Sequence, residues 1–235
     1  MDESPLLAVA HRAGNNLADL RAALAAGVDL VEADVHLYRG TLEVRHRKAV
    51  GPHYYWEQWT EVSRRRSLVV PHLRDVLAVA AGDPRLMLDL KGPSLAVAPR
   101  VAAALRAHAP GVRFAVCTKQ WRMLDSFAGN PEVGRVLSAG DPLQLSRLRA
   151  RLRRERAYGV SIRSSLLTPG VVAELRRSTD LVLAWPVDTE EALARARRIG
   201  VTGVISKNLP MLKQIVAQRD RRPVDDFPAG AALAA

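Results

Sequence analysis

The chain has 235 residues, which is enough for one large α/β domain or two small ones. A hydrophobic content of 48% excludes a disordered chain. No apolar run approaches the roughly 18 residues that would cross a bilayer. Lys and Arg outnumber Asp and Glu by 35 to 24, and the net charge of +11 favours anionic partners such as nucleic acid, anionic lipid or phosphorylated metabolites.

The start of the chain, "MDESPLLAVAHR", is acidic where a secretion signal is basic. We therefore expect a cytoplasmic protein whose first strand begins near residue 6. A single cysteine, Cys117, excludes an intrachain disulfide. No cluster of Cys and His has the spacing of a zinc site.

Short apolar runs typical of strands alternate with longer segments of helical periodicity. The predicted strands are 6–11, 29–35, 85–90, 112–117, 134–138, 158–162, 181–185 and 203–206. The predicted helices include 17–27, 94–108, 190–200 and 209–218. This alternation predicts the α/β class and one (β/α)8 TIM barrel over residues 1–220. A doubly wound open sheet is the alternative, but the chain has neither G-x-G-x-x-G nor a P-loop.

Residues 38–72 interrupt this alternation between the second and third strands. They contain a short strand-like run, "TLEVRH", an aromatic segment, "HYYWEQW", and the start of a helix at "PHLRDVLAVAA". We expect this insertion at the C-terminal mouth of the barrel, where its aromatic residues form a lid or contact an acyl chain. Residues 221–235 are expected to be a flexible tail.

Carboxylates occur at the ends of two neighbouring strands. Glu32 and Asp34 lie two residues apart in "LVEADVHL", so their side chains point to the same face. Two like charges side by side are unfavourable unless a positive group lies between them. The third strand adds Asp89 and, on the same face, Lys91. Three carboxylates at one barrel mouth predict a divalent cation, Mg2+ or Ca2+, because oxygen ligands suit these ions better than zinc.

Other chemically useful residues also follow strands. The first strand ends in His11 and Arg12, and the insertion carries His46. The later strands are followed by Lys119, Arg163, Trp185 and Lys207. Each of these candidate site residues, including Lys91, also has a structural explanation. Lys91 could simply pair with Asp89, and Trp185 could fill the core. His36 is expected in the loop after the second strand, with a structural role.

The Arg-rich stretch 145–156 has leucines at helical spacing, which predicts an outer barrel helix with a solvated basic face. This interpretation is favoured over a nucleic-acid or membrane surface. We therefore expect no nucleic acid partner and at most peripheral contact with anionic membrane. The oligomeric state is not predicted.

In this order, the motifs resemble those of the glycerophosphodiester phosphodiesterases. The chain has "HRAGNN", "EADV", "GTLEVRH", "LDLK" and "GVTGVISKNLP", where that family has His-Arg-Gly, Glu-x-Asp, a Gly followed by His, Glu-x-Lys and a closing Gly-rich motif. The resemblance extends from about residue 6 to residue 216. It implies a (β/α)8 barrel, a divalent cation and hydrolysis of glycerophosphodiesters to sn-glycerol 3-phosphate and an alcohol.

The resemblance also implies roles for individual residues. His11 and His46 correspond to a general acid/base pair, and Arg12 and Lys91 to phosphate-binding cations. Trp185 corresponds to a wall against the glycerol or alcohol group. The remaining correspondences are metal ligands: Glu32, Asp34 and Asp89. The family's Asn is best matched by Asn15. Whether a glycerol hydroxyl attacks first, forming a cyclic phosphate, or water attacks directly stays open.

Several positions depart from the family pattern. Ala13 replaces a glycine, Arg47 replaces an acid, Asp89 replaces a glutamate and Lys207 replaces an aspartate. Two alternatives therefore stay open. One is a phospholipase D-like hydrolase of lysophospholipids, and the other is a non-catalytic barrel that binds phosphorylated ligands.

Overall fold

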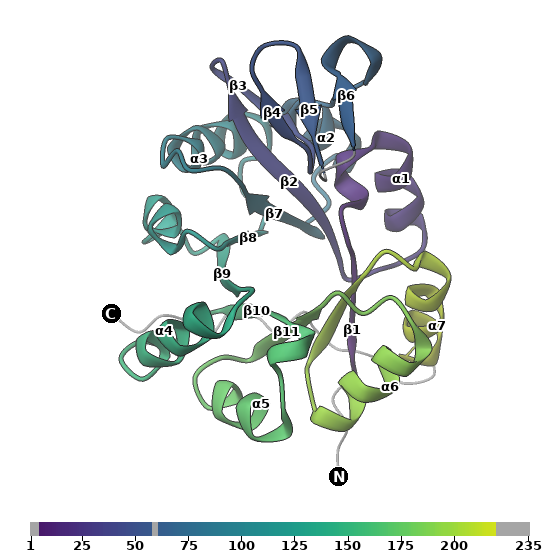
Figure 1. Cartoon of the computed structure of the whole chain (residues 1–235), viewed down its shortest axis with the longest axis vertical. Coiled ribbons are helices and arrows are strands. Elements are labelled where there is room, and N and C mark those ends of the chain that lie inside the picture. Colours follow the sequence, from purple (N-terminus) through teal and green to yellow (C-terminus); the bar gives the residue numbers. More distant parts are fainter. Residues whose placement is uncertain (1–4, 58–60, 220–235) are drawn as a thin grey trace.

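A computed structural model describes residues 5–57 and 61–219. The predicted tail, 221–235, lies outside the described residues. The main sheet has nine strands, and a pairing between the first two parallel strands closes eight of them into a parallel barrel (Figure 1). The barrel strands are β1 (Leu7–Ala10), β2 (Leu30–Tyr38), β7 (Leu86–Leu90), β8 (Phe114–Thr118), β9 (Val133–Ala139), β10 (Gly159–Arg163), β11 (Leu181–Trp185) and β12 (Gly203–Ser206).

Helices follow the barrel strands and cover the outside of the barrel (Figure 1). The α-helices are α1 (Leu17–Ala25), α2 (Leu73–Ala80), α3 (Val97–His108), α4 (Pro142–Leu152), α5 (Pro169–Arg176), α6 (Glu190–Ile199) and α7 (Leu209–Arg219). The 3-10 helices are η1 (Ala13–Asn15), η2 (Arg65–Ser67), η3 (Trp121–Phe127) and η4 (Ser164–Leu166). Each of the eight predicted strands overlaps a barrel strand, and the predicted (β/α)8 fold is confirmed. No helix in the described ranges is long and apolar enough to span a membrane.

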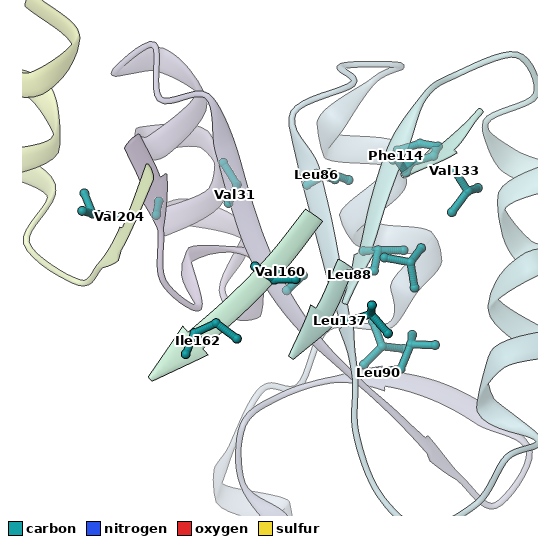
Figure 2. Packing of buried hydrophobic residues seen from close by; sticks show 14 of the residues in the cluster. Val31, Leu86, Leu88, Leu90, Phe114, Val133, Leu137, Val160, Ile162 and Val204 are labelled. Atoms are coloured by element: carbon teal, nitrogen blue, oxygen red, sulfur yellow. The ribbon is translucent and has the colours of Figure 1, made fainter. Parts of the chain in front are cut away.

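Two hydrophobic clusters result from the alternation of side chains along the strands. The larger cluster lies between the strands and the helices, where Val31, Leu88 and Val160 pack (Figure 2). The smaller cluster fills the inside of the barrel and includes Leu30 and Ile205. Both faces of each barrel strand are therefore buried, which is why the strands are nearly continuous apolar runs.

Many of the polar residues of the barrel strands lie toward the C-terminal ends, as Asp89 does on β7 and Ser138 on β9. The inside of the barrel is filled by layers of side chains taken from alternate strands. The strand registers place His11, Asp89, Ser138 and Trp185 in one such layer, from β1, β7, β9 and β11. The barrel interior is therefore largely polar at this level.

The insertion forms more structure than the sequence predicts. The predicted strand "TLEVRH" is β3 (Thr41–Val44), which pairs antiparallel with β2 and extends it as far as Tyr38. The predicted aromatic segment contributes a strand to a separate three-stranded sheet, whose members are β4 (Lys48–Val50), β5 (Tyr54–Trp56) and β6 (Val62–Arg64). Figure 1 shows these strands together beside β2, close to α1 and α2.

Candidate active site

Three buried carboxylates form the centre of the candidate site. Glu32 and Asp34 extend from β2, and Asp89 lies directly opposite Asp34 on β7. One carboxylate oxygen from each residue lies within 4.8 Å of the other two. The structure therefore brings together the three residues that the sequence predicts as metal ligands.

Lys91 neutralises part of this charge. Its Nζ lies 2.9 Å from Oδ1 of Asp34 and also forms an ion pair and hydrogen bond with Asp89. Burial alone would lower the pKa of Lys91, but Asp89 and Asp34 raise it above its usual range. The structural alternative for Lys91, a pairing with Asp89, is present, and it does not remove the lysine from the site.

One ammonium group does not balance three carboxylates. Burial, with Asp34 and Asp89 next in importance, raises the pKa of Glu32 well above its usual range. Burial would also raise the pKa of Asp34, but Lys91 and hydrogen bonds from His46 and Asn15 hold it below its usual range. The three oxygens thus provide hard, negatively charged ligands whose charge is incompletely compensated. This donor set fits a divalent cation of the Mg2+ or Ca2+ type.

Two histidines from different parts of the sequence contact this carboxylate cluster. Nε2 of His11, at the end of β1, lies 3.5 Å from Oε2 of Glu32. Nδ1 of His46, which follows β3, lies 3.3 Å from Oδ2 of Asp34. Burial and the neighbouring Arg12 lower the pKa of His11 from 6.5 to about 4, so this ring is neutral at neutral pH. Since Nδ1 of His46 faces Asp34, its Nε2 is the ring nitrogen left for a substrate.

The turn after β1 has a strained backbone that positions Arg12. This residue has a φ of 59°, in the left-handed region that is unusual for a side chain other than glycine. The Nε of Arg12 is buried without a hydrogen-bond partner among the described residues, 3.9 Å from Oδ2 of Asp34. Strain and an unsatisfied buried donor together indicate a functional position for this guanidinium.

Gly14 and Asn15 attach this turn to β2. A Cβ at Gly14 would lie 2.5 Å from Cβ of Ala33 and 2.9 Å from the backbone oxygen of Glu32, so no larger residue fits there. The close approach lets Asn15 donate from Nδ2 to Oδ2 of Asp34 at 2.8 Å and accept from the backbone N–H of Asp34 at 2.8 Å. Asn15, matched to the family only by motif, is thus a direct support of the carboxylate cluster.

The insertion contributes Glu57, a carboxylate that no sequence motif indicated. Oε1 of Glu57 lies 3.7 Å from NH1 of Arg12, and its Oε2 accepts from Nε of Arg47 at 2.8 Å. Arg47, one of the departures from the family pattern, is therefore held by an ion pair beside the site. No spacing pattern in the sequence predicts this contact between Arg12, which follows β1, and Glu57, which follows β5.

Trp185 lies at the end of β11, half-buried on the inner face of the barrel. Nζ of Lys119 lies 4.8 Å from the centre of its ring. The structure places Trp185 at the barrel mouth, as predicted, with a cation on its ring.

The predicted loop position of His36 is wrong. Pairing with β3 continues β2 as far as Tyr38, so His36 is a buried strand residue and does not lie in a loop. Burial and Arg45 lower its pKa to about 3.

A second residue that the sequence did not indicate is Asp188, which follows β11. Its Oδ1 accepts a hydrogen bond from the Ser206 hydroxyl at 3.0 Å.

Comparison with known proteins supports the fold. Models of known protein families give no match to the sequence, and curated proteins give none either. Solved structures do match. A phosphodiesterase from Oleispira antarctica, in complex with the product sn-glycerol-3-phosphate, aligns with a TM-score of 0.71 at 18% identity, covering 91% of this chain and 97% of that one.

Two further structures show the same similarity. A glycerophosphodiester phosphodiesterase from Thermotoga maritima aligns with a TM-score of 0.70 at 17% identity, covering 89% of this chain and 98% of that one. One from Parabacteroides distasonis gives 0.72 at 16% identity, covering 92% and 99%. At this level of identity the chain shares their (β/α)8 fold over nearly its whole length, and its activity has to be argued from its own residues.

Proposed function

We propose that the chain is a metal-dependent glycerophosphodiester phosphodiesterase, which hydrolyses glycerophosphodiesters to sn-glycerol 3-phosphate and an alcohol. One observation carries the proposal. Two histidines, three carboxylates and two cations meet at the mouth of a barrel whose fold matches that of phosphodiesterases.

In this proposal Glu32, Asp34 and Asp89 hold a divalent cation, Mg2+ or Ca2+. When bound, such a cation stabilises the charge that develops on the phosphate and lowers the pKa of an attacking hydroxyl. Arg12 and Lys91 bind phosphate oxygens, and their fixed positions spare the reorganisation that water would require.

The two histidines exchange protons with the substrate. His11 accepts the proton of the attacking hydroxyl at Nε2, the nitrogen that faces the carboxylate cluster. His46 donates a proton from Nε2 to the leaving alkoxide, while Asp34 holds its Nδ1. The bond between phosphorus and the leaving oxygen breaks. If water attacks, its oxygen stays on phosphorus and glycerol 3-phosphate forms directly; if a glycerol hydroxyl attacks, water then opens the cyclic phosphate in a second step.

Direct product analysis tests this function. The purified protein is incubated with glycerophosphocholine or glycerophosphoethanolamine, and glycerol 3-phosphate and the free alcohol are measured. We expect both products in equal amounts. A folded protein that binds metal and releases neither product from any diester would contradict the proposal and favour the non-catalytic alternative.

A lysophospholipid hydrolase is the second candidate, because one face of the small sheet exposes apolar side chains. Val50 is 51% exposed, Tyr54 44% and Val62 60%, and their strand positions place all three on the same face. Tyr55 points the other way and is buried, as a lid residue would be. Release of choline from lysophosphatidylcholine faster than from glycerophosphocholine would favour this candidate. In both cases the substrate is a small molecule and the site is unchanged.

A further inference from the structure

A second group of side chains at the barrel mouth is positively charged. Lys119, Arg163 and Lys207 lie at or just beyond the ends of β8, β10 and β12. Cys117 and Ile205, two residues before the lysines, belong to the cluster inside the barrel, so strand alternation turns both lysines inward.

Arg163 faces the same way by the same reasoning. Val160 and Ile162 of β10 belong to the cluster between strands and helices, so the next residue faces the barrel interior. Arg163 pairs in register with Trp185, whose side chain packs against the inner cluster. All three cations therefore face the mouth that contains the carboxylates.

The strand registers place these cations at one level. Lys119, Arg163 and Lys207 come from alternate strands, and the registers give Asp34 of β2 as the fourth member of their layer. This layer lies next to the layer of His11, Asp89, Ser138 and Trp185, on the side of the C-terminal ends of the strands. The carboxylates therefore lie on β2 and β7, with Lys91 paired to them, whereas Lys119, Arg163 and Lys207 belong to β8, β10 and β12.

The three cations have no ion-pair partner among the described residues. Two carboxylates that follow β11 and β9 accept backbone N–H groups: Oδ1 of Asp188 accepts from Lys207 at 2.8 Å, and Oδ1 of Asp141 accepts from Gln144 at 2.8 Å. Lys91 adds a further positive charge near Lys119. Unpaired cations gathered inside a concave mouth concentrate anions there.

Lys119 is also held in place before any ligand binds. Its ammonium group lies against the ring of Trp185, and Gly140 leaves the space that it occupies. A Cβ at Gly140 would lie 2.8 Å from Nζ of Lys119 and 3.2 Å from the Trp185 ring. The wall that the resemblance implies at Trp185, against the glycerol or alcohol group, therefore carries a fixed cation.

We propose that Lys119, Arg163 and Lys207 form a second anion-binding subsite that holds an anionic group, a phosphate or a carboxylate, on the leaving alcohol of a phosphodiester substrate. The inference rests on the proposed function and names its substrate class. A diester with an anionic leaving group gains contacts with all three cations, whereas a choline or ethanolamine group gains none of these contacts.

A matched pair of substrates tests the subsite. Glycerophosphoglycerol has an uncharged leaving alcohol, and bis(glycerophospho)glycerol has the same alcohol carrying a second phosphate. We expect kcat/KM to be at least about tenfold higher for the second compound, whose two scissile ends account for no more than about a doubling. Equal values after this correction would overturn the proposal.

Variants localise the effect. In Arg163→Gln/Lys207→Gln the ratio of the two kcat/KM values should fall to about that doubling. The matched control is Arg153→Gln/Arg154→Gln, which removes two exposed cations beyond the end of α4 and should leave the ratio unchanged. An equal fall in both double variants would assign the preference to net charge and contradict a subsite.

A binding measurement separates this inference from the proposed function. If no diester is hydrolysed, the proposed function fails, and both compounds are titrated calorimetrically into the same proteins. Tighter binding of bis(glycerophospho)glycerol than of glycerophosphoglycerol, lost in Arg163→Gln/Lys207→Gln, would still support the subsite. Equal binding of the two compounds would overturn it.

Discussion

At the scale of single residues, the site depends on a few contacts that hold charged groups together. Asp34 is the most connected of them, since it contacts Lys91, His46 and Asn15. None of these three contacts was predicted, because the pairing anticipated for Lys91 was with Asp89. The spacing of "EADV" predicts the carboxylates, but it contains no information about which side chains surround them.

Replacing His46 tests the proposed acid. His46→Ala should lower kcat by at least about 100-fold, because the leaving alkoxide loses its proton donor. The fold should persist, since this side chain is partly exposed and makes one contact with Asp34. His53→Ala, at an exposed position of the insertion, is the matched control and should keep full turnover. Unchanged kcat in His46→Ala would remove this histidine from the mechanism.

Gly14→Ala tests the close approach of the first turn to β2. The added methyl group meets Ala33 and the backbone of Glu32, so we expect a loss of about 1–3 kcal/mol in the free energy of unfolding. kcat/KM should fall with it, because Asn15 and Arg12 move with the turn.

The control for this prediction is Gly170→Ala in α5. A Cβ at Gly170 has no heavy atom within 4 Å, so its unfolding free energy should stay the same or rise by up to about 1 kcal/mol. Urea unfolding measures both variants. Equal stability of Gly14→Ala and the original protein would show that the turn does not need a glycine at position 14.

At the scale of elements, the insertion supplies His46 and Glu57 to a barrel that already contains the carboxylates. Its small sheet was missed because each of its strands has only three residues, too few to show an alternating pattern. By contrast, the barrel strands were predictable because burial on both faces makes them continuous apolar runs. Pairing of β2 with β3 explains why His36 was misplaced.

Glu43 connects β3, the insertion strand that pairs with β2 of the barrel, to the rest of the insertion. It is buried on β3, accepts from Nε of Arg45 at 2.8 Å and also forms an ion pair with Arg65. Glu43→Gln leaves these two arginines without their carboxylate, and Arg45 is itself buried. We expect a loss of about 3 kcal/mol in unfolding free energy, with reduced activity because His46 follows the same strand.

Glu155→Gln is the matched control for Glu43→Gln. Glu155 pairs with Arg151 and Arg135 at a position where half of its side chain is exposed, and its loss should cost less than about 1 kcal/mol. Urea unfolding compares the two variants. Equal losses would mean that the Glu43 cluster does not hold the insertion in place.

At the scale of the whole molecule, the barrel brings charged residues from position 11 to position 207 together at one mouth. The sequence indicated the residues that follow the barrel strands, because polar residues at strand ends interrupt apolar runs, but it did not indicate Glu57 or Asp188. The sequence does not show which of these residues share a layer inside the barrel, because the layers depend on the registers between strands. The contact between Glu57 and Arg12 was equally inaccessible, because no periodicity connects the insertion with β1.

Cation binding should stabilise the folded chain, because the carboxylate cluster exists only when β2 and β7 are paired. At a Mg2+ or Ca2+ concentration of 100 times Kd, the gain is about 2.7 kcal/mol, which raises Tm by about 5–10 °C for a chain of this size. Glu32→Gln should remove most of this shift. A shift of the same size in the original protein and in Glu32→Gln would place the cation elsewhere.

The central claim is that this mouth hydrolyses glycerophosphodiesters with the help of a divalent cation. The most direct test is release of glycerol 3-phosphate from glycerophosphocholine and glycerophosphoethanolamine at neutral pH, with Mg2+, with Ca2+ and with excess EDTA. We predict release that EDTA abolishes and that added cation restores. Full activity in excess EDTA would contradict the metal site, and no release under any of these conditions would contradict the proposed hydrolysis of these diesters.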